Sequence, residues 1–511
     1  MATNKQESIP PSCHNQINQQ LDNLLAIGIA LSAEKDRNKL LEMIISEARR
    51  ITNADAGTLY LREKEQLKIK IIHNQTMNTF LGGKGEEVDL PPVPLALEYV
   101  SGYCAITGQS INIPDVYQAE GFDFSGPRKY DEMTGYHTKS MLVIPLRNHL
   151  EEIIGVLQLI NALDTTDTQV IPFDTDYQNI IEALSSLAAI ALTNMQLVGD
   201  IENLFQSFVQ VMVTAIDAQT PYNASHSQQV SQLSLSLAKA LNSCNEGPFA
   251  EENFDQDRLD ELAMAGWLHD VGKIATPLSV MNKASRLDSH LEIVMMRIDL
   301  AIEQENSSSL RTQLKLIESE QQESATKELI AHQERLEKLR AAKELIVRAD
   351  NPATFIDPEL KEQLEALAQH SYQSSDGQRR SLLTAEELTC LTIPKGTLTD
   401  DERKIMEAHV EITDKMLAKM PFTKKYARVP LLAAMHHEHL DGKGYPCQLS
   451  GEKIPLEARI LAIADIFDAL TASDRPYKKG MPVTKALEIM GFMVKDGKLD
   501  KDLMELFASL V

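Results

Sequence analysis

The feature that most constrains this chain is a histidine doublet followed at once by a glycine-rich turn. His436 and His437 lead into an acidic stretch, and residues 442–446 then read Gly-Lys-Gly-Tyr-Pro. Glycine and proline in this arrangement force the backbone out of any helix. Neutral imidazole is the commonest metal ligand in proteins, so a doublet beside carboxylates predicts a metal site.

A second cluster of the same kind lies far upstream. His269 and Asp270 are followed by Gly272 and Lys273. A carboxylate beside a histidine, with a lysine close behind, suits a metal that faces a phosphate. At 511 residues the chain is long enough for two or three domains, each with its own core.

Composition excludes one class of partner and indicates a compartment. Fifty Lys and Arg against 74 Asp and Glu give a formal net charge of −24, whereas a nucleic acid polymer needs a basic surface. We therefore expect no nucleic acid polymer as a partner. The five cysteines form no CxxC pair, and no apolar run approaches the ~20 residues of a membrane span. A reduced, cytoplasmic protein without a membrane segment is predicted.

Residues 17–195 predict a small α+β module. Amphipathic helices come first, strands with a period of two follow, and a buried hairpin precedes a closing helix. This order resembles a GAF sensor domain, especially the GAF domains of mammalian cyclic-nucleotide phosphodiesterases. The strand patterns lie at 58–61, 67–71, 140–146 and 153–161, and a further helix is expected near 94–107.

The signature that follows the last strand in those domains is only half present. Asn161 and Phe173 match it, but Ala162 replaces its Lys, and Tyr177 and Gln178 replace its Asp and Glu. The resemblance implies either a small-molecule ligand at the GAF domain or a fold used for dimerisation alone.

Residues 180–215 predict a connecting helix. Apolar residues recur there in alternating steps of four and three, with Asn194 as a polar exception, and define one seam along the helix. The apolar members of this seam are Ile180, Leu184, Leu187, Ala191, Val198, Ile201, Phe205, Phe208, Met212 and Ala215. This heptad pattern is typical of a parallel coiled coil, so we expect a homodimer. The alternative is one long helix that packs against its own domains. Residues 1–16 are expected to form a flexible tail.

The C-terminal half predicts helices, interrupted by a segment of different character. Residues 285–395 contain a long charged stretch without Pro or Gly from 310 to 349, which predicts a long helix. We interpret the whole segment as a helical insertion that forms a helical hairpin.

Together, the two clusters resemble those of the HD-GYP family of cyclic dinucleotide phosphodiesterases, a branch of the HD metal-dependent phosphohydrolases. The resemblance implies an all-α HD-GYP domain over 204–511, so the predicted fold class is multidomain: an α+β GAF domain, a coiled-coil helix and an all-α domain with an insertion. The HD pattern H…HD…D is matched by His226, His269, Asp270 and Asp465, and the three histidines that HD-GYP members add are matched by His409, His436 and His437.

Seven nitrogen and oxygen ligands without a thiolate suit two divalent transition-metal ions, iron or manganese. We assign Asp270 as the bridge between them. Lys273 and Arg475 are expected to bind phosphate oxygens during catalysis. In the family the turn is thought to border the substrate and to meet GGDEF-domain partners; here it contains Gly442, Gly444, Tyr445 and Pro446. One metal is assigned to His226, His269 and Asp465, and the other to His409, His436 and His437.

The resulting prediction is an enzyme that hydrolyses cyclic di-GMP to pGpG or GMP under control of the GAF domain. Cyclic GMP-AMP stays an alternative substrate, because base contacts cannot be read from this pattern. A catalytically weak receptor or scaffold is the alternative from another class, and the intact ligand set counts against it.

Overall fold

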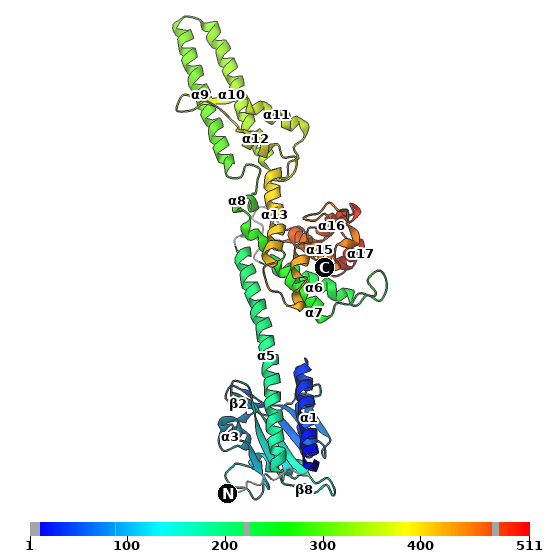
Figure 1. Cartoon of the computed structure of the whole chain (residues 1–511). Coiled ribbons are helices and arrows are strands. Elements are labelled where there is room, and N and C mark those ends of the chain that lie inside the picture. Colours follow the sequence, from blue (N-terminus) through cyan, green and yellow to red (C-terminus); the bar gives the residue numbers. More distant parts are fainter. Residues whose placement is uncertain (1–10, 87, 219–224, 473–479) are drawn as a thin grey trace, which may run out of the picture. The chain divides into compact units, whose positions relative to one another are not determined.

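The computed structural model describes residues 11–86, 88–218, 225–472 and 480–511. The chain divides into two compact units, Met1–Leu204 and Phe205–Val511 (Figure 1). The division lies one residue after 204, where the C-terminal domain was expected to begin. The first helix, α1 (Pro11–Ala33), begins inside the expected tail, so the prediction of a loose segment is wrong from residue 11 onward.

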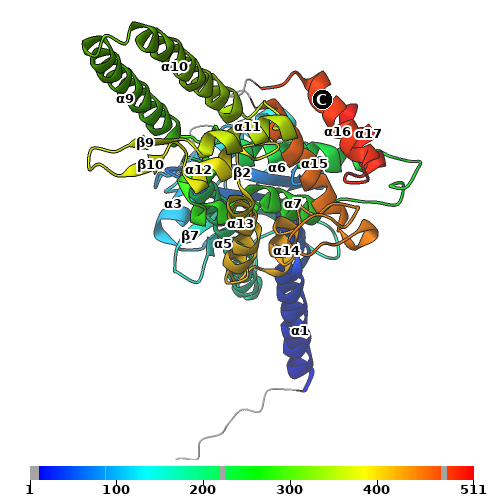
Figure 2. The ribbon, with the colours of Figure 1, turned by 90° about the horizontal axis from the view of Figure 1, so that it is seen from above.

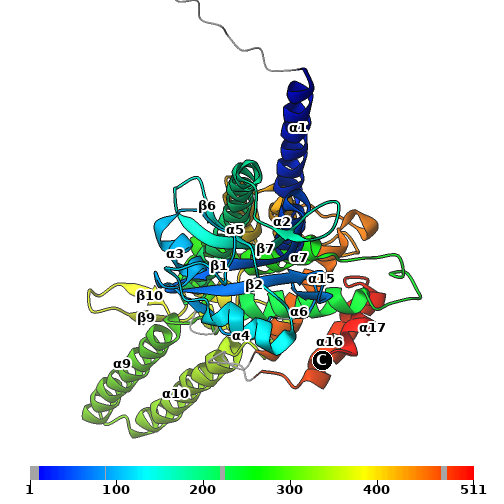
Figure 3. The ribbon, with the colours of Figure 1, turned by 90° about the horizontal axis from the view of Figure 1, so that it is seen from below.

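The first unit is built on an antiparallel sheet with the strand order β3-β2-β1-β7-β6-β5, which Figure 3 shows from below. The predicted buried hairpin is confirmed, because β6 pairs with β7 in antiparallel register. The strands are β1 (Ala54–Glu63), β2 (Gln66–Asn74), β3 (Thr79–Gly82), β5 (Ile111–Ile113), β6 (Met141–Arg147) and β7 (Ile153–Leu163), with β4 (Val93–Pro94) beside β2 and β8 (Val170–Ile171) beside β7.

Alternate residues of the central strands face two separate cores, as the period of a β-strand requires. On β1, Leu59 packs with the helices α1, α2 (Arg37–Thr52) and α5 (Thr175–Asp217), whereas Tyr60 packs with α3 (Val100–Thr107). A short helix, α4 (Ser125–Thr134), follows β5. Helix α3 begins six residues later than the expected 94–107, because Val93 and Pro94 instead pair with β2 as strand β4.

Helix α5 runs without interruption from Thr175 to Asp217. Its first half lies in the core of the first unit, where Ile181, Leu184 and Ala188 are fully buried. By length and composition it is the one helix in the described part of the chain that is long and apolar enough to cross a membrane. A core helix of a globular domain passes the same test.

The middle of α5 carries an exposed apolar stripe that differs in register from the predicted seam. Phe205 and Met212 were expected in the seam but pack against the core of the second unit, and the ring of Phe205 lies 6.2 Å from that of Phe422. The alternative of a helix packed against its own domains is therefore correct at these positions. The exposed residues are Leu197, Val198, Ile201, Leu204, Phe208 and Val211.

Outside the insertion, the second unit is a bundle of helices around one hydrophobic core. Helix α6 packs on α7 and α15, and α13 packs on the short η1 that follows α7. The helices of this bundle are α6 (His226–Leu241), α7 (Gln256–Leu268), η1 (Val271–Ala275), α8 (Leu278–Met281), α13 (Asp400–Leu417), η2 (Lys424–Tyr426), α14 (Val429–Ala433), η3 (Gly451–Lys453), α15 (Leu456–Thr471), α16 (Val483–Lys495) and α17 (Lys501–Ala508).

The insertion has a core of its own. Its helices α9 (His290–Glu318) and α10 (Gln322–Asp350) lie side by side in Figure 2, so the expected helical hairpin is confirmed. The single helix predicted over 310–349 is wrong, because the chain leaves the helix between Glu318 and Gln322. The chain reverses at Glu320, whose φ is +58°, because pairing of the two apolar faces outweighs the local helix propensity. The second unit is largely helical, as expected, and its insertion also contains one short two-stranded β-hairpin. Its other elements are α11 (Pro358–Ala368), β9 (Ser371–Gln373), β10 (Arg379–Ser381) and α12 (Ala385–Leu391).

A single buried arginine joins the two ends of the insertion. Arg286 is fully buried, and its guanidinium donates to the carbonyls of Ile393 at 3.1 Å and Ala349 at 2.6 Å. It also donates to Asn351 at 2.7 Å and Thr354 at 2.8 Å. The carbonyls of the buried residues Ala349 and Ile393 have to be satisfied away from water, and Arg286 does this for both.

We expect Arg286→Met to destabilise the insertion by more than ~3 kcal/mol, because several buried carbonyls lose a charged donor. Hydrogen exchange should then show lost protection in α9 and α10, with a lower Tm for the protein. Arg340→Met, on the exposed surface of α10, is the control and should change neither. Equal protection in both variants would contradict this role for Arg286.

Candidate metal centre

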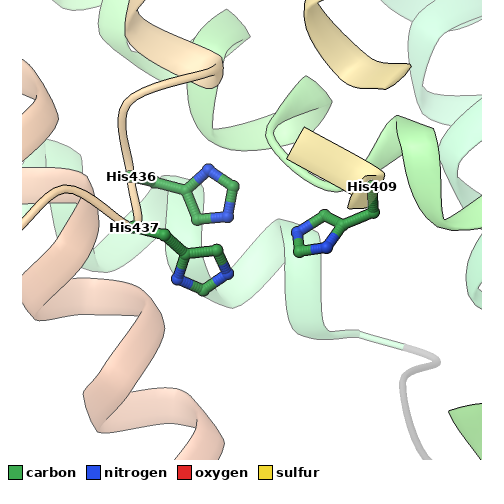
Figure 4. Close-up of side chains that lie close together, drawn as sticks. All are labelled: His409, His436 and His437. Carbon is green, nitrogen blue, oxygen red and sulfur yellow. The ribbon is translucent and has the colours of Figure 1, made fainter. Parts of the chain in front are cut away.

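The structure brings six of the predicted ligands into two adjacent groups. His409, His436 and His437 face one another (Figure 4), and their ligand atoms lie within 4.8 Å of one another. His226, His269 and Asp270 form the second group within the same limit.

These residues come from five separate segments. His226 begins α6, His269 ends α7, and His409 lies within α13. The doublet follows α14, and Asp465 lies in the otherwise apolar α15.

Asp270 stands between the two groups and offers one oxygen to each. Its Oδ1 lies 3.3 Å from His409 Nε2 and 3.9 Å from His436 Nε2. Its Oδ2 lies 3.4 Å from His226 Nε2 and 3.3 Å from His269 Nε2. The seventh predicted ligand, Asp465, places Oδ1 3.2 Å from His226 Nε2. The carboxylate of Asp270 thus has the position that a bridging ligand needs.

The backbone fixes which nitrogen each of three histidines presents to the centre. A carbonyl can only accept, so each of these Nδ1 atoms carries the proton, and Nε2 keeps its lone pair. Each Nδ1 donates to the carbonyl three residues earlier: His269 to Gly266 at 2.7 Å, His409 to Met406 at 2.6 Å and His436 to Ala433 at 2.7 Å.

The atoms that converge on the centre lack partners of their own. The Nε2 atoms of His269, His409 and His436 are buried without a hydrogen bond, and so is Oδ1 of Asp270. A buried polar atom without a partner is costly, and four in one place need a common ligand. Imidazole nitrogens and carboxylate oxygens are donors for divalent transition metals, so these residues fit metal ions.

The protonation states of the histidine doublet and of Asp270 suit metal binding. Burial lowers the pKa of His437 to about 4 and that of His436 well below its usual value, so both imidazoles are neutral near pH 7. Burial by itself would raise the pKa of Asp270, but the charge of Lys273 holds it well below its ordinary value. Lys273 Nζ contacts Asp270 Oδ2 directly. The histidine doublet therefore presents lone pairs rather than protons.

Asp468 is a site residue that the sequence analysis missed. Its Oδ2 lies 2.6 Å from His226 Nδ1, and its side chain is buried. The signal was present in the spacing, because Asp465 and Asp468 stand three apart on one helix and share a face. Burial opposes protonation of His226, yet the hydrogen bonds that its ring donates to Asp270, Asp465 and Asp468 raise its pKa well above the usual value. A cation bound there would take over the neutralising role of that proton.

The glycine-rich turn packs directly on the doublet. A Cβ on Gly444 would lie 2.3 Å from the backbone nitrogen of His439 and 2.5 Å from the carbonyl oxygen of His437, so only glycine fits. Tyr445 donates its backbone N–H to the same His437 carbonyl at 3.2 Å. Its ring lies against the His437 imidazole, with centroids 4.7 Å apart. The turn therefore orients a metal-ligand candidate, a role that sequence alone did not suggest.

Glu438 directly follows the doublet and fixes the backbone that leaves the glycine-rich turn. Its Oε1 accepts from Cys447 N at 2.6 Å, and its Oε2 accepts from Leu449 N at 2.8 Å. Gly442 supplies the left-handed conformation that the reversal needs, with a φ of +74°.

Gly272 allows the upstream cluster to approach α13. A Cβ there would lie 2.0 Å from the carbonyl oxygen of His409 and 2.6 Å from Thr413 N. The Gly272 N–H donates to Thr413 Oγ1 at 3.0 Å, and that hydroxyl donates to the carbonyl of His269 at 3.2 Å. This close packing brings Asp270 next to His409. The remaining predicted site residue, Arg475, lies outside the described residues.

Family models match both halves of the chain. The GAF domain model matches residues 36–192. An HD domain model matches 223–354, and a second HD domain model matches 382–503. The chain is a GAF–HD protein. Its HD domain carries the added histidines and the Gly-Tyr-Pro turn of the HD-GYP type.

Curated relatives of the GAF–HD protein are cyclic dinucleotide phosphodiesterases by name. The 3'3'-cGAMP-specific phosphodiesterase 3 of Vibrio cholerae is 46% identical over 19% of this chain and 20% of its own length. The cyclic di-GMP phosphodiesterase response regulator RpfG of Xanthomonas campestris is 46% identical over 18% and 24%. A cyclic di-GMP phosphodiesterase of Vibrio cholerae is 40% identical over 19% and 20%. The chain thus spans a quarter or less of the length of these relatives.

We expect Asp468→Asn to weaken metal binding by the HD domain about 10–100-fold, because it removes the carboxylate that orients His226. Competition with a chromophoric chelator measures this affinity. The control is Asp414→Asn, at an exposed position of α13, which should bind metal like the wild type. Equal retention of metal by the two variants would show that Asp468 does not position His226.

Proposed function

We propose that the HD domain is a metal-dependent phosphodiesterase that hydrolyses cyclic di-GMP to pGpG or GMP. The observation that carries this proposal is the position of Asp270, whose two oxygens face two different groups of metal-ligand candidates. Hydrolysis of a phosphodiester by two metals needs ligand sets that are adjacent and share a bridge.

Two divalent transition-metal ions bound there would polarise the scissile phosphate and supply an ionised water near neutral pH. We infer iron or manganese, because the donors are imidazole and carboxylate without a thiolate. In this proposal Asp270 bridges the ions. His226, His269 and Asp465 hold one, and His409, His436 and His437 hold the other.

The chain's own residues bind and orient the substrate. Lys273, which contacts Asp270, is placed to offset charge on a phosphate oxygen when a substrate arrives. Arg475 is proposed to bind the second phosphate of the ring, since a guanidinium suits two oxygens at once. The turn at Gly442, Gly444, Tyr445 and Pro446 is proposed to border the substrate. In the described residues, Tyr445 already covers one side of His437.

Cyclic GMP-AMP is a second candidate substrate, because a relative at 46% identity is named as specific for 3'3'-cGAMP. The metal centre does not distinguish the two, since both rings contain the same phosphodiester chemistry. A catalytically weak receptor is disfavoured, because such a protein has no need for six convergent ligand candidates.

We further propose a cytoplasmic homodimer whose GAF domain senses a small molecule. The exposed stripe on α5 supports the dimer, because Leu197, Ile201, Leu204, Phe208 and Val211 repeat in steps of four and three. Cys104, Cys244, Cys390 and Cys447 are unpaired, which fits a reducing compartment. GGDEF-domain proteins are proposed partners for the Gly-Tyr-Pro turn.

We expect the purified full-length protein to hydrolyse cyclic di-GMP. The Asp270→Ala variant should be at least about 100-fold less active and should lose most of its metal, because the bridging carboxylate is gone. Chromatography of the products with cyclic di-GMP and cyclic GMP-AMP in parallel identifies the preferred substrate. Asp496→Ala, at an exposed position, controls for the loss of a carboxylate. Hydrolysis of neither dinucleotide by a fully metal-loaded wild type would contradict the proposed activity, and full activity of Asp270→Ala would contradict the site.

A further inference from the structure

The GAF domain contains a cavity whose lining defines the kind of molecule it accepts. The cavity has a volume of about 560 Å³, within the range of small-molecule sites. Strands β1, β2, β6 and β7 form one wall, and the Leu90–Pro94 segment, α3 and the start of α4 form the other. It lies on the face of the sheet that packs with α3, since Tyr60 and Met141 belong to both the lining and that core.

The described lining of the cavity includes five aromatic side chains and no positively charged side chain that could neutralise an anionic ligand. None of the described lining residues is Lys, Arg or His, and Asp123 is the one carboxylate among them. A phosphate moved from water into such a cavity would lose its hydration without gaining a cation, which is strongly unfavourable. The aromatic side chains are Tyr60, Tyr99, Phe124, Tyr130 and Tyr136.

The helix end at the cavity does not supply a phosphate site either. Ser125 and Gly126 at the start of α4 line the cavity, and such backbone N–H groups can bind anions. Here, however, Oδ1 of Asp123 already accepts from Ser125 N at 2.8 Å. The N-terminus of α4 therefore has its own negative charge, and a second anion would be repelled.

One buried amide offers a directional contact inside the cavity. Gln158 is 8% exposed, and its Oε1 accepts from the Tyr60 hydroxyl at 3.0 Å. Its Nε2 donates to the Met141 thioether at 3.6 Å. Sulfur is a weak acceptor, so a carbonyl or ring nitrogen of a ligand would be a better partner for this N–H group.

We propose that this cavity binds an uncharged, planar aromatic molecule with one acceptor for the Gln158 amide, and that it does not bind cyclic nucleotides. The proposal rests on the GAF domain acting as a small-molecule sensor. The proposed ligand differs from the cyclic nucleotide that the resemblance to GAF domains of mammalian cyclic-nucleotide phosphodiesterases would imply. The same chain departs from their signature at Ala162, Tyr177 and Gln178.

The test uses prodan, a neutral naphthalene ketone whose emission shifts on leaving water, with the full-length protein. Two competitors of nearly the same shape are compared: 2-acetylnaphthalene, which is neutral, and 2-naphthoate, which is an anion. We expect saturable prodan binding at one site per chain, and displacement at least 10-fold more effective with the ketone. Cyclic GMP and cyclic AMP should not displace prodan. Displacement by 2-naphthoate or cyclic GMP as effective as that by the ketone would overturn the proposal.

Two variants locate the site. Ser101→Phe places a large side chain in the cavity wall and should abolish prodan binding, whereas Ser319→Phe, exposed in the insertion, should not. Gln158→Leu should weaken binding of the ketone about 10-fold. Prodan binding that survives Ser101→Phe in a protein with an unchanged circular dichroism spectrum would show that the cavity is not the site. These readouts do not involve phosphodiesterase activity, so failure here is distinct from failure of the proposed catalytic function.

Discussion

A buried carboxylate between two groups of imidazoles governs the architecture of the HD domain. Asp270 is 5% exposed and has no hydrogen-bond partner at Oδ1, a state that is costly unless positive charge compensates it. Lys273 contributes one charge from the same segment. The helices that carry His226, His409 and Asp465 must converge on this point, so the fold of the second unit serves to bring distant ligands to one carboxylate.

The convergence depends on backbone contacts as much as on the ligands. Carbonyls near the ends of α7 and α14 hold the Nδ1 atoms of His269 and His436, which fixes the tautomer without any extra side chain. Gly272 permits contact with α13, and Gly444 permits the turn to lie on the doublet. The Gly-Tyr-Pro turn consequently contacts the candidate metal centre through His437 and is more than a surface loop.

Sequence alone was enough to order the domains and to name the ligand candidates, because strongly periodic segments and a spaced His/Asp pattern are local signals. It failed where tertiary contacts decide. Asp468 gains its role from His226, a partner 242 residues away in the chain, and Glu438 gains its role from the backbone N–H groups of the loop that folds back on it. The exposed stripe of α5 differs from the predicted seam because Phe205 packs against the core of the second unit. The reversal at Glu320 has no glycine or proline to mark it, and the first helix begins before the expected boundary.

Anomalous diffraction from crystals of the metal-loaded full-length protein, recorded at the absorption edge of the bound metal, tests the central claim most directly. The account predicts two peaks, one on each side of the Asp270 carboxylate, with the first near His226 and His269 and the second near His409, His436 and His437. A single peak, or peaks that Asp270 does not bridge, would contradict it.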